Sequence, residues 1–77
     1  MSSKLLQDAG QALYGPRWQS DLARDLSVAD RTIRRWAAGT ADLPPGVALD
    51  LLMICGNRAR ALDDLRRRLE IAAASDR

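Results

Sequence analysis

The sequence has 77 residues, of which 47% are hydrophobic and 29% are charged, and its formal net charge is +2. This hydrophobic content suffices for one small packed core, which argues against an extended disordered chain. The lone Cys55 excludes an intrachain disulfide framework, and the absence of histidine removes the usual ligands of a zinc site. No hydrophobic run approaches the roughly 20 residues that span a bilayer, and the N-terminus lacks a signal-peptide core. We therefore expect a cytoplasmic single-domain protein with no metal, cofactor or small-molecule ligand.

The first expected helix covers about residues 3 to 14. Ser2 or Ser3 can cap its start, and Gly15-Pro16 ends it, because proline cannot continue the hydrogen-bond ladder. Gly10 weakens the helix by up to about 1 kcal/mol, so tertiary packing must hold it. Hydrophobic residues recur there at helical spacing: Leu5, Leu6, Ala9, Ala12 and Leu13.

The second expected helix runs from about residue 18 to residue 26, with Leu22, Ala23 and Leu26 facing inward. Its N-terminus is a candidate phosphate-binding end, because unpaired N–H groups and the helix dipole favour an anion there. The residues at that end are Arg17, Trp18 and Gln19. For Trp18, a place in the core is the alternative interpretation. Asp21 and Asp25 are expected to be solvated charges that stabilise the helix.

The third expected helix spans about residues 29 to 38 and ends at Gly39, a good residue for a helix C-terminus. At about 100° per residue, Ile33 and Trp36 share one direction, which makes a hydrophobic face. The opposite arc carries charged residues: Asp30, Arg31, Arg34 and Arg35. This face has the width and chemistry to enter a DNA major groove, where an arginine can bond guanine O6 and N7. Asp30 would accept from a cytosine amine or orient a neighbouring arginine.

From about Pro45 to residue 73 the pattern predicts one long C-terminal helix, kinked or broken near Gly56 as the alternative. A hydrophobic stripe follows steps of four and three residues, interrupted only by Arg66: Ala48, Leu52, Cys55, Ala59, Leu62, Leu69 and Ala73. Cys55 is expected to be a buried thiol. Three short helices cannot cover about 40 Å of helix, so we expect Leu62, Leu65 and Leu69 to form a dimer interface with a second copy. The alternative is a flap that folds back on its own domain.

The fold class is therefore expected to be all-α, with three short helices and a long C-terminal helix. Within residues 3–44, the segment LARDLSVADRTIRRWAAG resembles the helix-turn-helix of the Cro and lambda-repressor class of transcriptional regulators. Matching positions occur in register without insertion: Gln19, Leu22, Ala23, Val28, Ile33, Trp36 and Gly39. Two positions depart from the pattern, because Ser27 replaces the common turn glycine and Ala29 replaces the usual Ser or Thr cap.

The resemblance implies a homodimeric repressor that binds double-stranded operator DNA, often of a phage or mobile element. By position it places Asp30, Arg31, Arg34 and Arg35 at base edges or flanking phosphates. It also places Gln19 and Thr40 at phosphates. An alternative function is a protein-interaction module or antitoxin whose C-terminal helix binds another protein. An enzyme is not expected, because the sequence has no histidine, no glycine-rich phosphate loop and no nucleophile beside a base.

Overall fold

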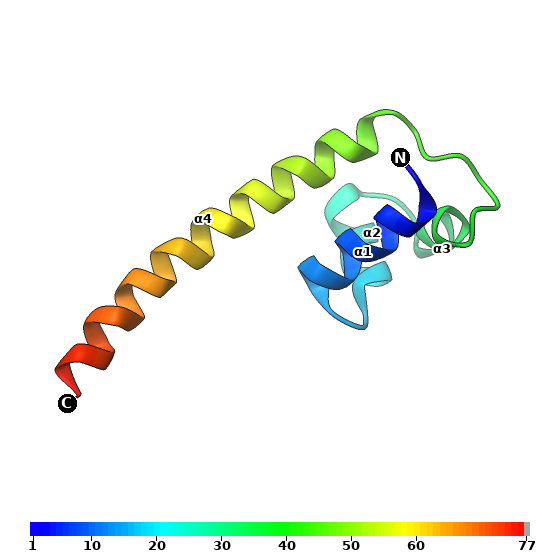
Figure 1. Cartoon of the computed structure of the whole chain (residues 1–77). Helices are drawn as coiled ribbons and strands as arrows, with labels where there is room; N and C mark the ends of the chain where they lie inside the picture. Colours follow the sequence, from blue (N-terminus) through cyan, green and yellow to red (C-terminus); the bar gives the residue numbers. More distant parts are fainter. Residues whose placement is uncertain (77) are drawn as a thin grey trace.

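The computed structural model describes residues 1–76, which fold into four helices and no strand (Figure 1). The helices are α1 (Ser3–Tyr14), α2 (Trp18–Leu26), α3 (Asp30–Ala38) and α4 (Gly46–Ser75). The predicted all-α class is confirmed, and the short helices begin and end within one residue of their expected bounds. Helix α4 passes through Gly56 without a break, so the expectation of one long helix holds.

Helices α1, α2 and α3 pack together into a compact unit, which we call the three-helix head (residues 3–38), and the start of α4 lies across it (Figure 1). The eight buried hydrophobic residues come from all four helices, so the core lies where the head meets α4. They are Leu6, Trp18, Leu22, Ala23, Ile33, Trp36, Val47 and Leu51. Leu5 and Ala12, two of the hydrophobic residues that recur at helical spacing in α1, are exposed.

The packing of α1 against α2 explains the glycine inside α1. A Cβ atom added at Gly10 would lie 2.1 Å from Cε3 of Trp18. The indole ring therefore rests on the bare backbone of α1, and Trp18 is only 4% exposed. The lower helix propensity of glycine is offset by the close approach that it permits.

A polar contact joins the end of α1 to α2 and α4. The Tyr14 hydroxyl donates to the Asp25 carboxylate over 2.6 Å, and the Arg58 guanidinium lies 5.8 Å from the centre of the Tyr14 ring. Burial of the phenol, together with the hydrogen bond to Asp25, raises the pKa of Tyr14 to about 12. Asp25 is exposed, as expected for a solvated charge, and in addition accepts this hydrogen bond from Tyr14.

Helix α4 extends well beyond the head and makes the molecule 53 Å long but only 21 Å wide (Figure 1). Only its first turns pack on the head, through Val47, Leu51 and the half-buried Ile54. The expected stripe of Ala48, Leu52, Cys55 and Ala59 is exposed. The expectation that Cys55 is a buried thiol is therefore wrong, because the head contacts the neighbouring face of α4.

Within residues 1–76, no helix combines the length and hydrophobicity needed to cross a membrane. The same part of the chain contains no group of three or more acidic or cysteine side chains placed to hold a metal ion.

The Gly10–Trp18 contact yields a stability prediction. Gly10→Ala should lower the free energy of unfolding by about 1–3 kcal/mol, because the added methyl group overlaps the indole ring. Gly46→Ala is the matched control, since a Cβ atom there meets nothing within 4 Å. Urea unfolding followed by tryptophan fluorescence measures both variants. Equal stability of the two would contradict the packing.

The Tyr14–Asp25 hydrogen bond yields a pH prediction. Tyr14→Phe should lower the free energy of unfolding by about 1 kcal/mol at neutral pH. Because the pKa of Tyr14 is raised from 10.0 to about 12, this contribution is complete below pH 10 and is lost as the pH rises through 12. Urea titrations of both proteins from pH 7 to 12 should therefore converge. A gap that stays constant to pH 12 would refute the assignment.

Candidate nucleic-acid interface

The rotation of α3 about its axis is fixed by two side chains. Ile33 is fully buried and Trp36 is 7% exposed, and both belong to the core. Because a helix presents opposite faces 180° apart, burial of these residues turns the other arc outward. The charged residues on that arc are all exposed, and they are the four predicted base-contacting positions, Asp30, Arg31, Arg34 and Arg35.

The three arginines of this arc, Arg31, Arg34 and Arg35, form what we call the arginine face. Within residues 1–76, none of them takes part in an ion pair or donates a side-chain hydrogen bond. Two arginines of α4 behave differently, since Arg66 bonds Asp63 and Glu70 and Arg67 bonds Asp63 on the same helix. The guanidinium groups of the arginine face are thus available to an external anion or acceptor.

The single carboxylate on this arc, that of Asp30, is hydrogen-bonded to a side chain of α2. Asp30 Oδ2 accepts a hydrogen bond from the Ser20 hydroxyl over 2.9 Å. Asp30 and Arg34 are four residues apart and could have formed a helical ion pair. The bond to Ser20 joins the two helices instead, so the expectation that Asp30 orients a neighbouring arginine is not met in this structure. Ser20 is a positioning residue that the sequence analysis did not identify.

The turn between α2 and α3 has the geometry that the sequence required. Ser27 is left-handed, with φ 58° and ψ 41°, at the position where glycine is common. The N–H of Val28 donates to the carbonyl of Ala23 over 2.9 Å, which closes the end of α2. Ala29 provides no side-chain cap for α3.

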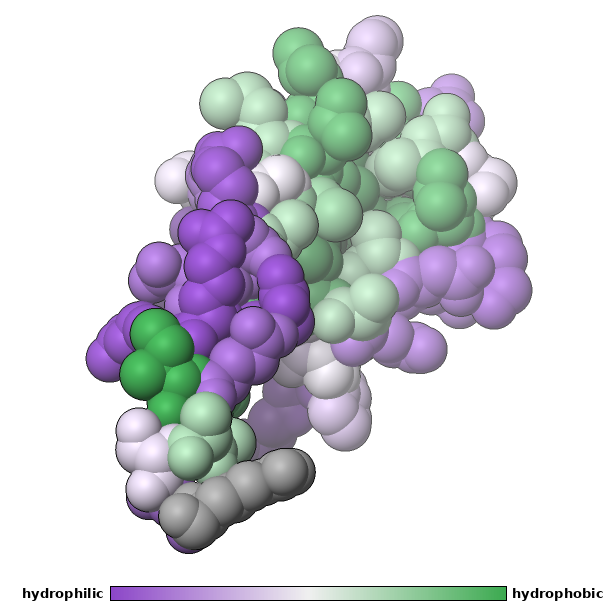
Figure 2. Space-filling model, turned by 60° about the vertical axis from the view of Figure 1, so that its left-hand side comes forward, coloured by the Kyte–Doolittle hydropathy of each residue, from purple (hydrophilic) through white to green (hydrophobic). Residues whose placement is uncertain are grey.

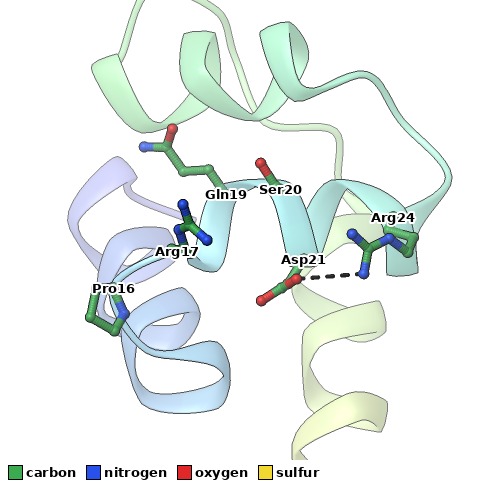
Figure 3. Close-up of a pocket in the computed structure, with 6 residues that line it drawn as sticks. All are labelled: Pro16, Arg17, Gln19, Ser20, Asp21 and Arg24. Carbon is green, nitrogen blue, oxygen red and sulfur yellow. Dashed lines mark ion pairs between the residues drawn. The ribbon is translucent and has the colours of Figure 1, made fainter.

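The N-terminus of α2 borders a shallow hollow beside the head (Figure 3). Arg17 and Gln19, two of the predicted phosphate-contacting residues, line it together with Ser20. On its other side Asp21 is paired with Arg24 over 3.5 Å. In Figure 3 the Ser20 hydroxyl points toward α3, whereas the side chain of Gln19 extends away from the ion pair.

The structure does not support two other predicted phosphate contacts, those of Trp18 and Thr40. Trp18 is 4% exposed and packs on Gly10, so the core interpretation is right and a phosphate role for its ring is not supported. The hydroxyl of Thr40 donates to the carbonyl of Arg35 over 3.2 Å. Its proton therefore helps to close the C-terminus of α3 and is not free for a phosphate.

Two side chains of α1 hold the C-terminal end of α3, and neither was identified from the sequence. The Ser3 hydroxyl donates to the carbonyl of Trp36 over 2.9 Å, and the Gln7 amide donates to the carbonyl of Ala37 over 2.8 Å. These carbonyls belong to the last turn of α3, where the carbonyl of Trp36 also accepts from the N–H of Gly39 over 3.2 Å. Both ends of α3 are thus fixed by other helices, which makes the arginine face rigid.

The left-handed turn residue yields a prediction. Ser27→Gly should raise the free energy of unfolding by about 0.5–1 kcal/mol, because glycine adopts a positive φ without steric cost. The path of the turn should stay the same, since the backbone already has this geometry. Chemical denaturation measures the change. A destabilised glycine variant would show that the Ser27 side chain contributes an interaction of its own.

The assembled site is an exposed arginine face on a fixed helix, beside the N-terminus of a second helix, and it offers N–H donors to a polyanion. Comparison with family models, with curated proteins and with solved structures gave no significant match to the chain.

Proposed function

We propose that this chain is a sequence-specific DNA-binding regulator of transcription that acts in the cytoplasm. It would insert α3 into a major groove and place the start of α2 on the adjacent phosphates. The observation that carries the proposal is the arginine face, with three exposed guanidinium groups that have no partner within residues 1–76. A merely solvated helix surface would gain from acidic partners one turn away, as the C-terminal part of α4 does.

Each residue of the site would have a distinct task. Arg31, Arg34 and Arg35 would read base edges or hold flanking phosphates, and guanine is the base that an arginine fork fits best. Arg17 and Gln19 would fix the register of the protein on the backbone without reading sequence. Asp30 keeps acceptor capacity beside its bond to Ser20, so it could accept from a cytosine amine.

The protein would bind as a homodimer and recognise a two-fold symmetric operator, most simply as a repressor. Support comes from the exposed hydrophobic side chains of α4, which a second copy could cover. The same side chains support a second candidate function, an antitoxin or adaptor whose α4 binds another protein. Light scattering of the isolated chain separates the two functions, because only the first predicts a stable symmetric dimer without any added partner.

Binding-site selection from random DNA tests the proposal. We expect one enriched two-fold symmetric site, a dissociation constant in the nanomolar range, and an affinity that falls steeply with salt. Arg35→Ala should reduce discrimination at one base pair of each half-site by about 1–3 kcal/mol. Gln19→Ala should weaken all sequences alike.

Arg60→Ala is the matched control for the arginine variant. It removes the same charge from α4, where Arg60 is bonded to Asn57 away from the arginine face. Fluorescence anisotropy with the selected site and a scrambled site measures all three variants. If the intact protein enriches no site, or if Arg60→Ala loses as much discrimination as Arg35→Ala, the proposal fails.

A further inference from the structure

The C-terminal half of α4 exposes a row of leucines that no part of the head covers. Every residue from Ala59 to Ser75 is exposed except Asp63, which is half-buried. The row consists of Leu62, Leu65 and Leu69, which we call the leucine face, and these side chains are 57%, 43% and 58% exposed. Together with Ala73 they line a shallow groove bordered by Arg66 and Glu70. Figure 2, in which the C-terminal end of the molecule comes forward, shows hydrophobic residues exposed between hydrophilic ones.

The solvent-accessible surface of the chain indicates how much area a partner could cover. The chain exposes 5697 Å², whereas a compact domain of 8.5 kDa exposes about 4,650 Å². The excess of roughly 1,000 Å² exceeds the approximately 800 Å² that each partner buries in a standard protein interface. Most helical stability in proteins comes from the packing of a hydrophobic face, and the half of α4 from Ala59 to Ser75 has no such packing within residues 1–76. A partner that covers the leucine face would bury this excess surface and would stabilise this half of the helix.

The position of the head restricts how a second copy can lie there. At about 100° per residue, measured from Val47, the head-contacting Leu51 and Ile54 lie at about +40° and −20°. On the same scale Leu65, Leu69 and Leu62 lie at about 0°, 40° and 60°. The leucine face therefore points to the side of α4 on which the head lies. In Figure 1 the head occupies that side of the first half of α4 and leaves the second half open.

A parallel pair would place both heads between the two helices at the same end. Helices in contact through leucines lie about 8–10 Å apart, whereas the molecule is 21 Å across where the head lies. We propose that two copies of this chain pair antiparallel through α4, crossing near Leu65. The C-terminal half of each helix then occupies the open space beside the partner's head.

The charged residues around Leu65 lie outside the leucine face. On the same scale Asp63 and Asp64 lie at about 160° and 260°, more than about 100° from its centre. Asp63 is also paired with Arg66 and Arg67 on its own helix. The orientation of the pair is therefore set by the position of the head.

The pairing deepens the proposed function, although it is argued from α4 alone. With the crossing at Leu65, the two Val47 residues lie about 54 Å apart along the helix axis. This separation exceeds the approximately 34 Å of one DNA turn. Half-sites of the proposed operator should therefore be spaced by more than one turn.

Distance measurements without DNA test the orientation. Native Cys55 is exposed and takes one nitroxide label, and a second protein carries the label at Ser75→Cys with Cys55→Ser. Both positions are ten residues from Leu65, so each should give an interlabel distance of about 30 Å. A parallel pair would give about 10 Å at both positions and would overturn the proposal.

Sedimentation equilibrium tests the leucine face itself. Leu65→Asp should convert a dimer into a monomer, with a weakening of self-association of at least a hundredfold. Ile71→Asp is the matched control, because Ile71 is 69% exposed on the opposite side of the same helix half and should leave the dimer intact. A monomeric wild-type protein at 50 µM, or equal effects of the two substitutions, would overturn the proposal.

These experiments separate the pairing from the proposed function. A dimer with the expected distances but no selected DNA site would refute only the DNA-binding proposal. A monomer that still selects a site through Arg35 would refute only the antiparallel pairing.

Discussion

The burial of Ile33 and Trp36 is the constraint on which the rest of the structure depends. A short helix on a small core can rotate about its axis, and these two side chains remove that freedom. Bonds from Ser3 and Gln7 to the last turn of α3, and from Ser20 to Asp30 in its first turn, fix the helix at both ends. Arginines placed between these anchors must face outward, so the direction of the charged face follows from hydrophobic packing.

Helix positions and the inner residues of the core were predictable because they depend on local signals. Periodicity placed Leu6, Leu22 and Ile33 inside, and Gly15-Pro16 and Gly39 fixed helix ends through backbone chemistry. Ser20 and Gln7 were missed because their partners lie 10 and 30 residues away, and no local pattern shows which helices will meet. Gly10 was recognised as a weakness, but the ring that requires it was visible only in the fold.

Errors along α4 have a common cause. Periodicity identifies a hydrophobic stripe without saying which part of it a domain will cover. The head contacts Val47 and Leu51, so the adjacent stripe through Leu52 and Cys55 stays in solvent. A 30-residue helix on a head of three short helices must leave most of its surface open. The assignment of Leu62, Leu65 and Leu69 to an interface depended on the stripe and on the length of the helix. The length is confirmed, and the interface stays a prediction.

Two arginines of α4 are paired with carboxylates, whereas the arginines of α3 are not. In α4, Arg66 and Arg67 are bonded to carboxylates one turn away, which stabilises a helix that has little other support. In α3, Arg31 and Arg35 are four residues apart and repel each other, and Asp30 bonds Ser20 in place of Arg34. The repulsion between Arg31 and Arg35 and the absence of an Asp30–Arg34 ion pair each cost about a few tenths of a kcal/mol of helix stability. A surface that serves only solubility has no reason to accept that cost, whereas a surface that meets phosphates recovers it on binding.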